Sequence, residues 1–219
     1  MAHIVRSIIL IVTTLFPIVN PLGTAPLFLS FTQSGTPEDR WILSRKIATN
    51  SFFLLLCSIL IGTHVLSFFE ISLPIVQVGG GLVVISAGWA MLKSDDEGHE
   101  EDRKELERTA TAQVLQRKAF YPLTLPLTVG PGSIATAITL GANIPRSDAS
   151  ALLFALFEAT IGSLVMALLV WVCFAFADRT AKLLGPTAMS VMTRLSAFLL
   201  TCIGLQIVWN GIRALSHQL

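Results

Sequence analysis

The stretch "FPIVNPLGTAPLF", residues 16–28, lies inside the first long apolar run of the chain. It contains three prolines, one glycine and one asparagine where a continuous helix is otherwise expected. Proline removes a backbone N–H donor, clashes with the carbonyl one turn back, and disfavours helical geometry in the residue before it. We therefore expect the backbone to unwind at Asn20, which directly precedes Pro21.

The composition indicates a membrane protein. The chain has 219 residues, of which 53% are hydrophobic and 13% charged, and its mean hydropathy is +0.71. Soluble domains average about 25% charged residues. The apolar residues form six runs, each near the roughly 20 residues that a transmembrane helix needs: 4–33, 46–69, 73–92, 119–142, 150–177 and 190–213. We predict an all-α polytopic membrane protein with six transmembrane helices.

A second broken run, "YPLTLPLTVGPG" at residues 121–132, repeats the prolines of the first. Its prolines match those of the first stretch at a constant offset of 105 positions: Pro17 with Pro122, Pro21 with Pro126, and Pro26 with Pro131. The pattern predicts two three-helix repeats, 1–92 and 119–219, joined by a charged loop, 93–118. Because three spans return the chain on the opposite side, the repeats are inverted, an architecture common among secondary transporters.

The basic residues predict the orientation. Lys and Arg concentrate in cytoplasmic loops of membrane proteins. Eleven of them fall in the segments after the first, third and fifth runs, whereas three fall on the opposite side. This bias places both termini outside, in the periplasm of a Gram-negative host. It also makes the loop 93–118 cytoplasmic, and we interpret that loop as a solvated segment.

The two predicted breaks offer backbone polar groups to a ligand. A half-helix that starts after a break presents free N–H groups and partial positive charge, and one that ends there presents free carbonyls. These groups suit a small zwitterion. The alternative interpretation is that the prolines only shape helix packing. The candidate substrate-binding residues are Asn20, Pro21, Gly23, Thr24, Pro26, Thr128, Gly130, Pro131, Gly132 and Ser133.

Glu158 is an ionisable residue inside the fifth run, which makes it a functional hypothesis by default. Small residues recur every four positions beside it and predict close helix packing: Ala151, Ala155, Ala159, Ser163 and Ala167. We therefore expect Glu158 to face the bundle. It is the candidate proton-coupling residue, and a hydrogen bond that only fixes packing is the equally weighted alternative.

Several other classes are disfavoured. The chain has no H-E-x-x-H or G-x-S-x-G motif and no paired carboxylates in its spans, so we expect no enzymatic activity, cofactor or metal. A net charge of +1 does not favour nucleic-acid binding. The expected partners are a small zwitterionic substrate, membrane lipid and, as the candidate coupling ion, protons. The oligomeric state is left open.

These motifs resemble those of a known family. The segments "NPLGTAPLF" (20–28), "PLTLPLTVGPGSIATAI" (122–138) and "GLQIVWNGI" (204–212) are similar to the MarC family of bacterial inner-membrane proteins, also described as the neutral amino acid transporter family. The segment "EISLPIVQVGGGL" (70–82) departs from the family pattern, with Glu70 where a glycine is expected.

The resemblance implies six spans in an inverted repeat and transport of small neutral amino acids, such as glycine and alanine, across the inner membrane. It also implies a link to the proton gradient. Site status carries over to the motif positions Asn20, Pro21, Gly23, Pro26, Gly130, Pro131 and Gly132. The alternatives are export of other small solutes or drugs, and a channel or assembly protein without carrier activity.

Overall fold

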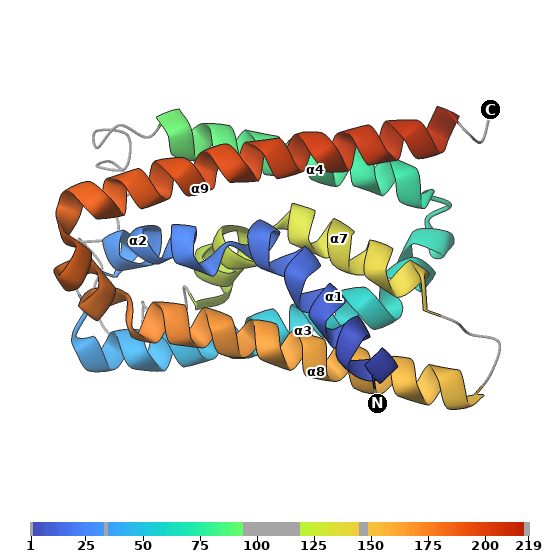
Figure 1. The fold of residues 1–219 in the computed structure, drawn as a ribbon, viewed down its shortest axis with the longest axis horizontal. Coiled ribbons are helices and arrows are strands. Elements are labelled where there is room, and N and C mark those ends of the chain that lie inside the picture. Colours follow the sequence, from blue (N-terminus) through green and yellow to red (C-terminus); the bar gives the residue numbers. More distant parts are fainter. Residues whose placement is uncertain (1, 33–34, 94–118, 145–148, 217–219) are drawn as a thin grey trace.

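A computed structural model of the chain describes residues 2–32, 35–93, 119–144 and 149–216. The regular structure in these residues is entirely helical. The helices in chain order, labelled as in Figure 1, are α1 (Ala2–Val19), α2 (Pro21–Phe31), α3 (Pro37–Phe68), α4 (Leu73–Lys93), η1 (Ala119–Thr128), α7 (Pro131–Ala142), α8 (Ala149–Ala175) and α9 (Ala177–Ser216).

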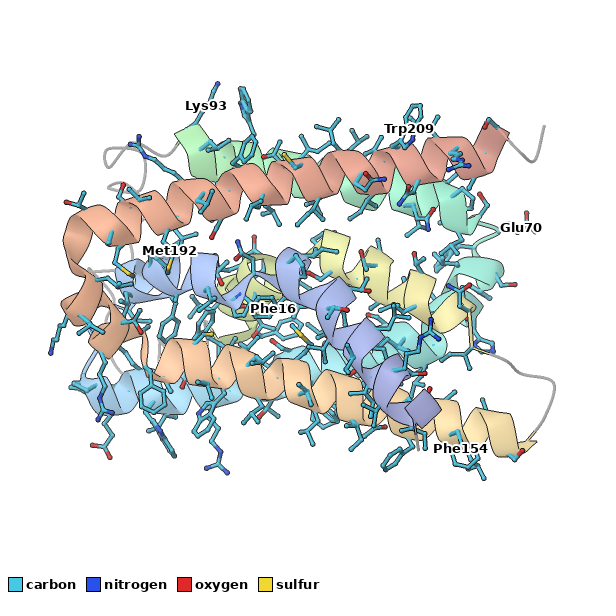
Figure 2. All side chains as sticks on the ribbon, viewed as in Figure 1. Phe16, Glu70, Lys93, Phe154, Met192 and Trp209 are labelled. Carbon is cyan, nitrogen blue, oxygen red and sulfur yellow. The ribbon has the colours of Figure 1, made fainter. Side chains whose placement is uncertain are left out.

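Five helical segments among the described residues are long and apolar enough to cross a membrane: Ile4–Leu29, Pro37–Phe68, Leu73–Lys93, Leu152–Ala175 and Thr187–Ser216. The first of them combines α1 and α2. The fourth of the six predicted spans, 119–142, is not a continuous helix, because it is divided into η1 with 10 residues and α7 with 12. Large apolar side chains such as Phe154 and Trp209 are more than half exposed on the outside of the bundle (Figure 2), as a lipid-facing surface requires.

The helices form layers (Figure 1). α4 and α9 lie side by side and antiparallel along one edge of the view, and α3 and α8 lie along the opposite edge. The shorter helices α1, α2, η1 and α7 lie between them. α3 packs mainly against α7 and α8, whereas α4 packs mainly against α9.

Small residues bring α4 and α9 into close contact. A Cβ atom added at Gly81 would lie 2.8 Å from the carbonyl oxygen of Gly204, and one added at Gly204 would lie 2.9 Å from that of Gly81. Gly88 faces the carbonyl of Ala197 in the same way, and Gly211 faces that of Pro74. The two backbones therefore touch along most of their length, without room for a side chain at these positions.

The main apolar core lies between α3, α8 and the shorter helices. Phe28 of α2 stacks on Phe174 of α8 with ring centroids 4.7 Å apart. The predicted small-residue stripe of α8 is buried at its described side chains, Ala155, Ala159, Ser163 and Ala167. A separate buried cluster of Ile18, Val84 and Leu200 joins the α4–α9 pair to the helix α1.

The two ends of the molecule differ. α3 and α9 begin and α4 ends at one end, where an ion pair joins Arg40 of α3 to Asp178 of α9, and both chain termini lie at the other end (Figure 1). Figure 2 shows Lys93 and Glu70 at these opposite ends. Apart from Lys93, the predicted charged loop lies outside the described residues. Glu70, where the resemblance leads us to expect a glycine, adopts a left-handed conformation with φ 56°, which glycine adopts without steric cost.

Candidate functional site

The first helix break is one residue long. Asn20 separates α1 from α2 and adopts the left-handed conformation, with φ 46° and ψ 55°. Asparagine is one of the few residues other than glycine that tolerate this region. The Asn20 N–H still donates to the Phe16 carbonyl at 2.8 Å, and the Asn20 carbonyl accepts from the Thr24 N–H and hydroxyl, each at 3.0 Å. The chain therefore changes direction at Asn20 without losing these bonds.

The oxygen of the Asn20 side-chain amide is hydrogen-bonded within the protein, and its nitrogen remains available. Its Oδ1 accepts a hydrogen bond from the Gly23 N–H at 3.2 Å, which caps the start of α2. Within the described part of the chain, Nδ2 has no hydrogen-bond acceptor. Because Asn20 also lines a cavity shared with the second break, these amide N–H groups can serve a ligand.

The second break is spread over several residues. Tyr121 and Leu125, which each precede a proline, have extended backbones within η1. Gly130, which precedes Pro131, is also extended, with φ −83° and ψ 177°. α7 then begins without a side-chain cap, so the first-turn N–H groups lack the partner that Asn20 gives to α2. The two prolines after the predicted break positions thus follow non-helical residues, as expected.

Each break also leaves a carbonyl without its helical donor. Pro21 and Pro131 have no N–H, so the carbonyls of Pro17 and Leu127, four residues earlier, cannot receive the usual bond. In contrast, the hydroxyl of Thr128 is satisfied internally, since it donates to the Leu123 carbonyl at 2.8 Å. The breaks therefore leave both N–H donors and carbonyl acceptors without helical partners, and of the two carbonyl residues Leu127 lines the cavity described next whereas Pro17 does not.

The two breaks meet at one cavity of about 250 Å³. Its polar wall comes from both halves of the chain, and it contains seven of the ten predicted site residues: Asn20, Thr24, Thr128, Gly130, Pro131, Gly132 and Ser133. The Ser133 side chain is buried in the protein, and no hydrogen bond joins its hydroxyl to another described residue. A ligand in this cavity would reach the open N-terminus of α7 and the Asn20 amide together.

Three predicted site residues do not line the cavity. Pro21 is buried in the first turn of α2, and Pro26 lies inside α2 without breaking it. Gly23 does not line the cavity either, and a Cβ at this position would collide with Ser196 of α9 and with the Asn20 amide. Gly23 instead permits close packing of α2 on α9 beside the break.

Gly132 has a comparable packing role while it lines the cavity. A Cβ at this position would overlap Cγ2 of Val84 and lie 3.3 Å from the Gly80 carbonyl. α4 thus approaches the first turn of α7 closely. The closest neighbour of Gly132 is therefore α4 and not the first break.

The apolar wall of the cavity was not predicted. It comes from α1, α2, α4 and α9, and includes Leu27, Phe31, Val83, Ala87, Met91 and Leu200. Apolar residues that line a cavity look like any others in a hydrophobic span, so periodicity does not identify them. The run Gly79–Gly81 was the one available signal, since it permits close approach of α4 to its neighbours.

Glu158 is half-buried on α8 and does not line this cavity. The lining residues come from α1, α2, α4, η1, α7 and α9, and α8 contributes none. A contact between Glu158 and a ligand at the breaks therefore has no support in this geometry, and a role in proton coupling stays a prediction.

The fold and cavity define a polytopic helical membrane protein with two broken helices around a shared site. A family model described as MarC family integral membrane protein matches residues 5–216, and the chain belongs to this family. No solved structure matches the chain.

Curated relatives match over nearly the full length. The chain is 30% identical over 217 residues to the UPF0056 inner membrane protein MarC of Escherichia coli, and 29% identical over 217 residues to that of Salmonella typhimurium. Both matches cover 97% of this chain and 96% of the relative. It is 27% identical over 206 residues to the UPF0056 membrane protein YvbG of Bacillus subtilis, which covers 92% of each protein.

Proposed function

We propose that this protein is a secondary transporter of small neutral amino acids of the glycine and alanine type, which moves them across the bacterial inner membrane by alternating access. The observation that carries the proposal is the cavity at which the two helix breaks meet. Non-helical backbone at membrane depth is tolerated where it is buried or lines a wet cavity, and transporters use such breaks to bind substrate.

The chemistry of the cavity suits a zwitterion. The uncapped first turn of α7, the Ser133 hydroxyl and the Asn20 amide offer donors for a carboxylate. Leu127 lines the cavity, and its carbonyl offers an acceptor for an ammonium group, since Pro131, four residues later, cannot donate to it. Among the described residues, no Asp, Glu, Lys or Arg lines the cavity, so the polar groups suit a molecule without net charge.

Helix packing supports an inverted repeat of six crossings, in which η1 and α7 together form the fourth crossing along the chain. In such a repeat, the helices α1, α2, α3 and α4 of the first half correspond to η1, α7, α8 and α9 of the second. The contact of α1 with α8 then corresponds to that of η1 with α3, and the contact of α2 with α9 corresponds to that of α7 with α4. All four contacts are present. The α4–α9 interface has the same symmetry. Its Gly81–Gly204 contact is flanked by the contacts Gly88–Ala197 and Pro74–Gly211 on its two sides.

The remaining parts of the proposal concern location and energy. Relatives in Escherichia coli and Salmonella are named inner membrane proteins, which supports the same location for this chain. The bias of basic residues supports termini on the outside. Protons are the proposed coupling ion, with Glu158 as the candidate carrier, and we propose no enzymatic activity and no cofactor.

The deciding experiment is counterflow in proteoliposomes of the purified protein. Vesicles loaded with unlabelled glycine or alanine should accumulate the labelled amino acid transiently, because a carrier exchanges bound substrate and a channel does not. Asn20→Asp is the test variant for the site, and Glu158→Gln is the variant for proton dependence. No exchange of any neutral amino acid by folded protein would overturn the proposal, whereas exchange of other solutes alone would favour a different export role.

A further inference from the structure

A groove on the lipid-facing side of the bundle is separate from the cavity at the breaks. It runs between α3 and α8, which lie side by side (Figure 1). Two small buried residues, Ala48 of α3 and Ala167 of α8, line it and leave room between the two helices. The larger apolar side chains along it include Phe53, Leu164 and Leu168. We use the term α3–α8 groove for the space that these five residues line.

The groove becomes polar toward the beginning of α3. Trp41, Arg45 and Thr49 line it, and the same three residues line an adjoining recess beside the start of η1. The recess adds Lys46 and Asn50. Of the described residues that line the groove or the recess, none is Asp or Glu. The groove therefore has a cationic end and an apolar remainder.

The position of Arg45 is supported by aromatic rings, and its charge is not neutralised. Its guanidinium lies over the Trp41 ring at 6.0 Å, and Trp41 meets Trp171 of α8 edge-on with ring centroids 6.4 Å apart. No carboxylate in the described part of the chain pairs with Arg45. The charge is therefore available to an anion, and the planar, multiply donating guanidinium suits a phosphate group.

The cationic and apolar parts follow one another along the direction in which a phospholipid lies in a bilayer. Arg45 directly precedes the apolar run 46–69 of the sequence. Phe53 lies roughly 12 Å further along the axis of α3. Phe53, Leu164 and Leu168 are each more than half exposed, so lipid hydrocarbon covers this part of the groove in a membrane. A molecule with a charged head and an apolar chain would contact both parts at once.

We infer that the α3–α8 groove binds one anionic phospholipid, with its phosphate at Arg45 and Lys46 and an acyl chain along the apolar part. Basic recesses between transmembrane helices bind the headgroups of anionic lipids. A zwitterionic lipid such as phosphatidylethanolamine would bring an ammonium group to the cationic end, where no described carboxylate receives it. Phosphatidylglycerol brings the phosphate without that cation. This site lies outside the proposed transport cavity and does not depend on transport.

The test measures lipid retention by native mass spectrometry of the purified protein in detergent with equal amounts of phosphatidylglycerol and phosphatidylethanolamine. We expect the wild-type protein to retain one phosphatidylglycerol in preference to phosphatidylethanolamine. Arg45→Gln should lower this preference about fivefold, since one cation near anionic headgroups contributes about that factor.

Arg179→Gln is the matched control. Arg179 is also exposed at this end of the bundle and also lies over an aromatic ring, that of Phe176 at 5.3 Å. However, it lines neither the groove nor the recess. We therefore expect Arg179→Gln to retain the wild-type lipid preference.

A second pair of variants tests the path of the acyl chain. Thr49 is exposed and lines both the groove and the recess, so Thr49→Phe places a large side chain where the two parts join. We expect Thr49→Phe to lower the amount of phosphatidylglycerol retained. Ile61→Phe, at another exposed position of α3 that does not line the groove, should leave that amount unchanged. Thermal unfolding with and without the lipid reports the folding of each variant and its stabilisation by the lipid.

Three results would overturn the inference. Equal retention of the two lipids by the wild-type protein would exclude the anionic preference. An equal fall in Arg45→Gln and Arg179→Gln would assign that preference to overall charge and not to the groove. Wild-type retention of phosphatidylglycerol by folded Thr49→Phe would place the lipid elsewhere. None of these readouts involves amino acid exchange, so a failure here leaves the transport proposal intact, and an absence of exchange leaves the lipid site intact.

Discussion

At the residue scale, Asn20 combines two tasks that single substitutions can separate. Its left-handed backbone and the Oδ1 cap on Gly23 shape the break, while the residue also lines the cavity. Asn20→Asp keeps the acceptor and a residue type that tolerates this conformation, but it removes the amide donors. We expect exchange to fall at least about tenfold with little change in thermal unfolding, since a site built around a hydrogen bond discriminates strongly when that bond is lost.

Asn20→Gly and Asn20→Ala are the matched controls for this prediction. Glycine accepts the left-handed backbone, whereas alanine both loses the cap, at about 0.5–2 kcal/mol, and pays the left-handed conformational cost of roughly 1–2 kcal/mol. We expect Ala to be the least stable of the three variants in thermal unfolding. Wild-type exchange by Asn20→Asp would place the ligand away from this amide.

Glu70 is a second residue in left-handed backbone, and here no side-chain function explains it. It follows α3 with φ 56°, fully outside the bundle. Glu70→Gly should therefore stabilise the protein by about 0.5–1 kcal/mol, because glycine adopts this conformation without a steric cost. Thermal unfolding of Glu70→Gly is compared with that of Glu70→Ala, which removes the charge and keeps the strain. Equal stabilisation by both would assign the effect to the charge.

Gly132 links the site to α4. Any side chain here meets Val84, so Gly132→Leu should abolish exchange in folded protein by filling the cavity beside the α7 N-terminus. Gly132→Ala should lower exchange less severely, and the additional substitution Val84→Ala should restore part of it, because it removes the overlapping Cγ2 atom. Full activity of folded Gly132→Leu would contradict the placement of substrate at this break.

At the scale of the helices, three successive glycines of α4 have three different surroundings. A Cβ at Gly79 meets nothing within 4 Å, one at Gly80 meets Ala135 of α7, and one at Gly81 meets the backbone of α9 at 2.8 Å. Gly79→Ala should stabilise α4 by about 0.5–1 kcal/mol, since alanine is the better helix former. Gly81→Ala should destabilise by roughly 1–3 kcal/mol, because a backbone cannot yield as a side chain does.

Thermal unfolding of the two alanine variants in the same detergent checks this contrast. Gly80→Ala is a case between these two, because the nearest neighbour of the added Cβ is the Ala135 side chain and not a backbone atom. Equal effects of Gly79→Ala and Gly81→Ala would show that α4 and α9 do not pack as described.

The elements also show what a sequence can and cannot predict. The prolines fixed the break positions correctly at Asn20 and Gly130, since proline acts locally on the residue before it. The same rule did not predict that α2 would continue through Pro26 while its partner Pro131 begins a helix. A proline determines locally which carbonyl loses its donor. Whether the helix continues past that proline depends on packing with neighbouring helices.

The candidate site was predictable to the same extent. Its polar residues lie at the breaks and can be identified in the sequence, whereas the apolar wall of the cavity is formed by residues of separate helices that the fold brings together. Glu158 shows a different limit of sequence reasoning: the sequence identifies a charge in a span, but it does not tell that the helix of this residue contributes nothing to the cavity, and the role of Glu158 in proton coupling stays a prediction. Which residues line a cavity depends on how the helices pack, and the residue types alone indicate only part of that arrangement.

At the scale of the whole molecule, the number of membrane crossings fixes where the termini lie. Five segments meet the length and hydropathy expected of a continuous span, and an odd number of crossings would place the termini on opposite sides. If η1 and α7 together make a sixth crossing, the number is even. Both termini lie at the same end of the molecule (Figure 1), away from the beginning of α3 and the end of α4.

We therefore expect both termini on the same, outer side of the membrane. Fusions of a periplasm-active reporter to Leu219 and to a point before Ala2 should both be active, and fusions near Lys93 should be inactive, because the basic residues favour the cytoplasm at that end. Fusion after Ala142 is the decisive position: activity there requires that η1 and α7 cross the membrane after the charged loop. Inactivity after Ala142 together with opposite behaviour of the two termini would leave five crossings, and a single re-entrant α7 could not then complete an inverted repeat.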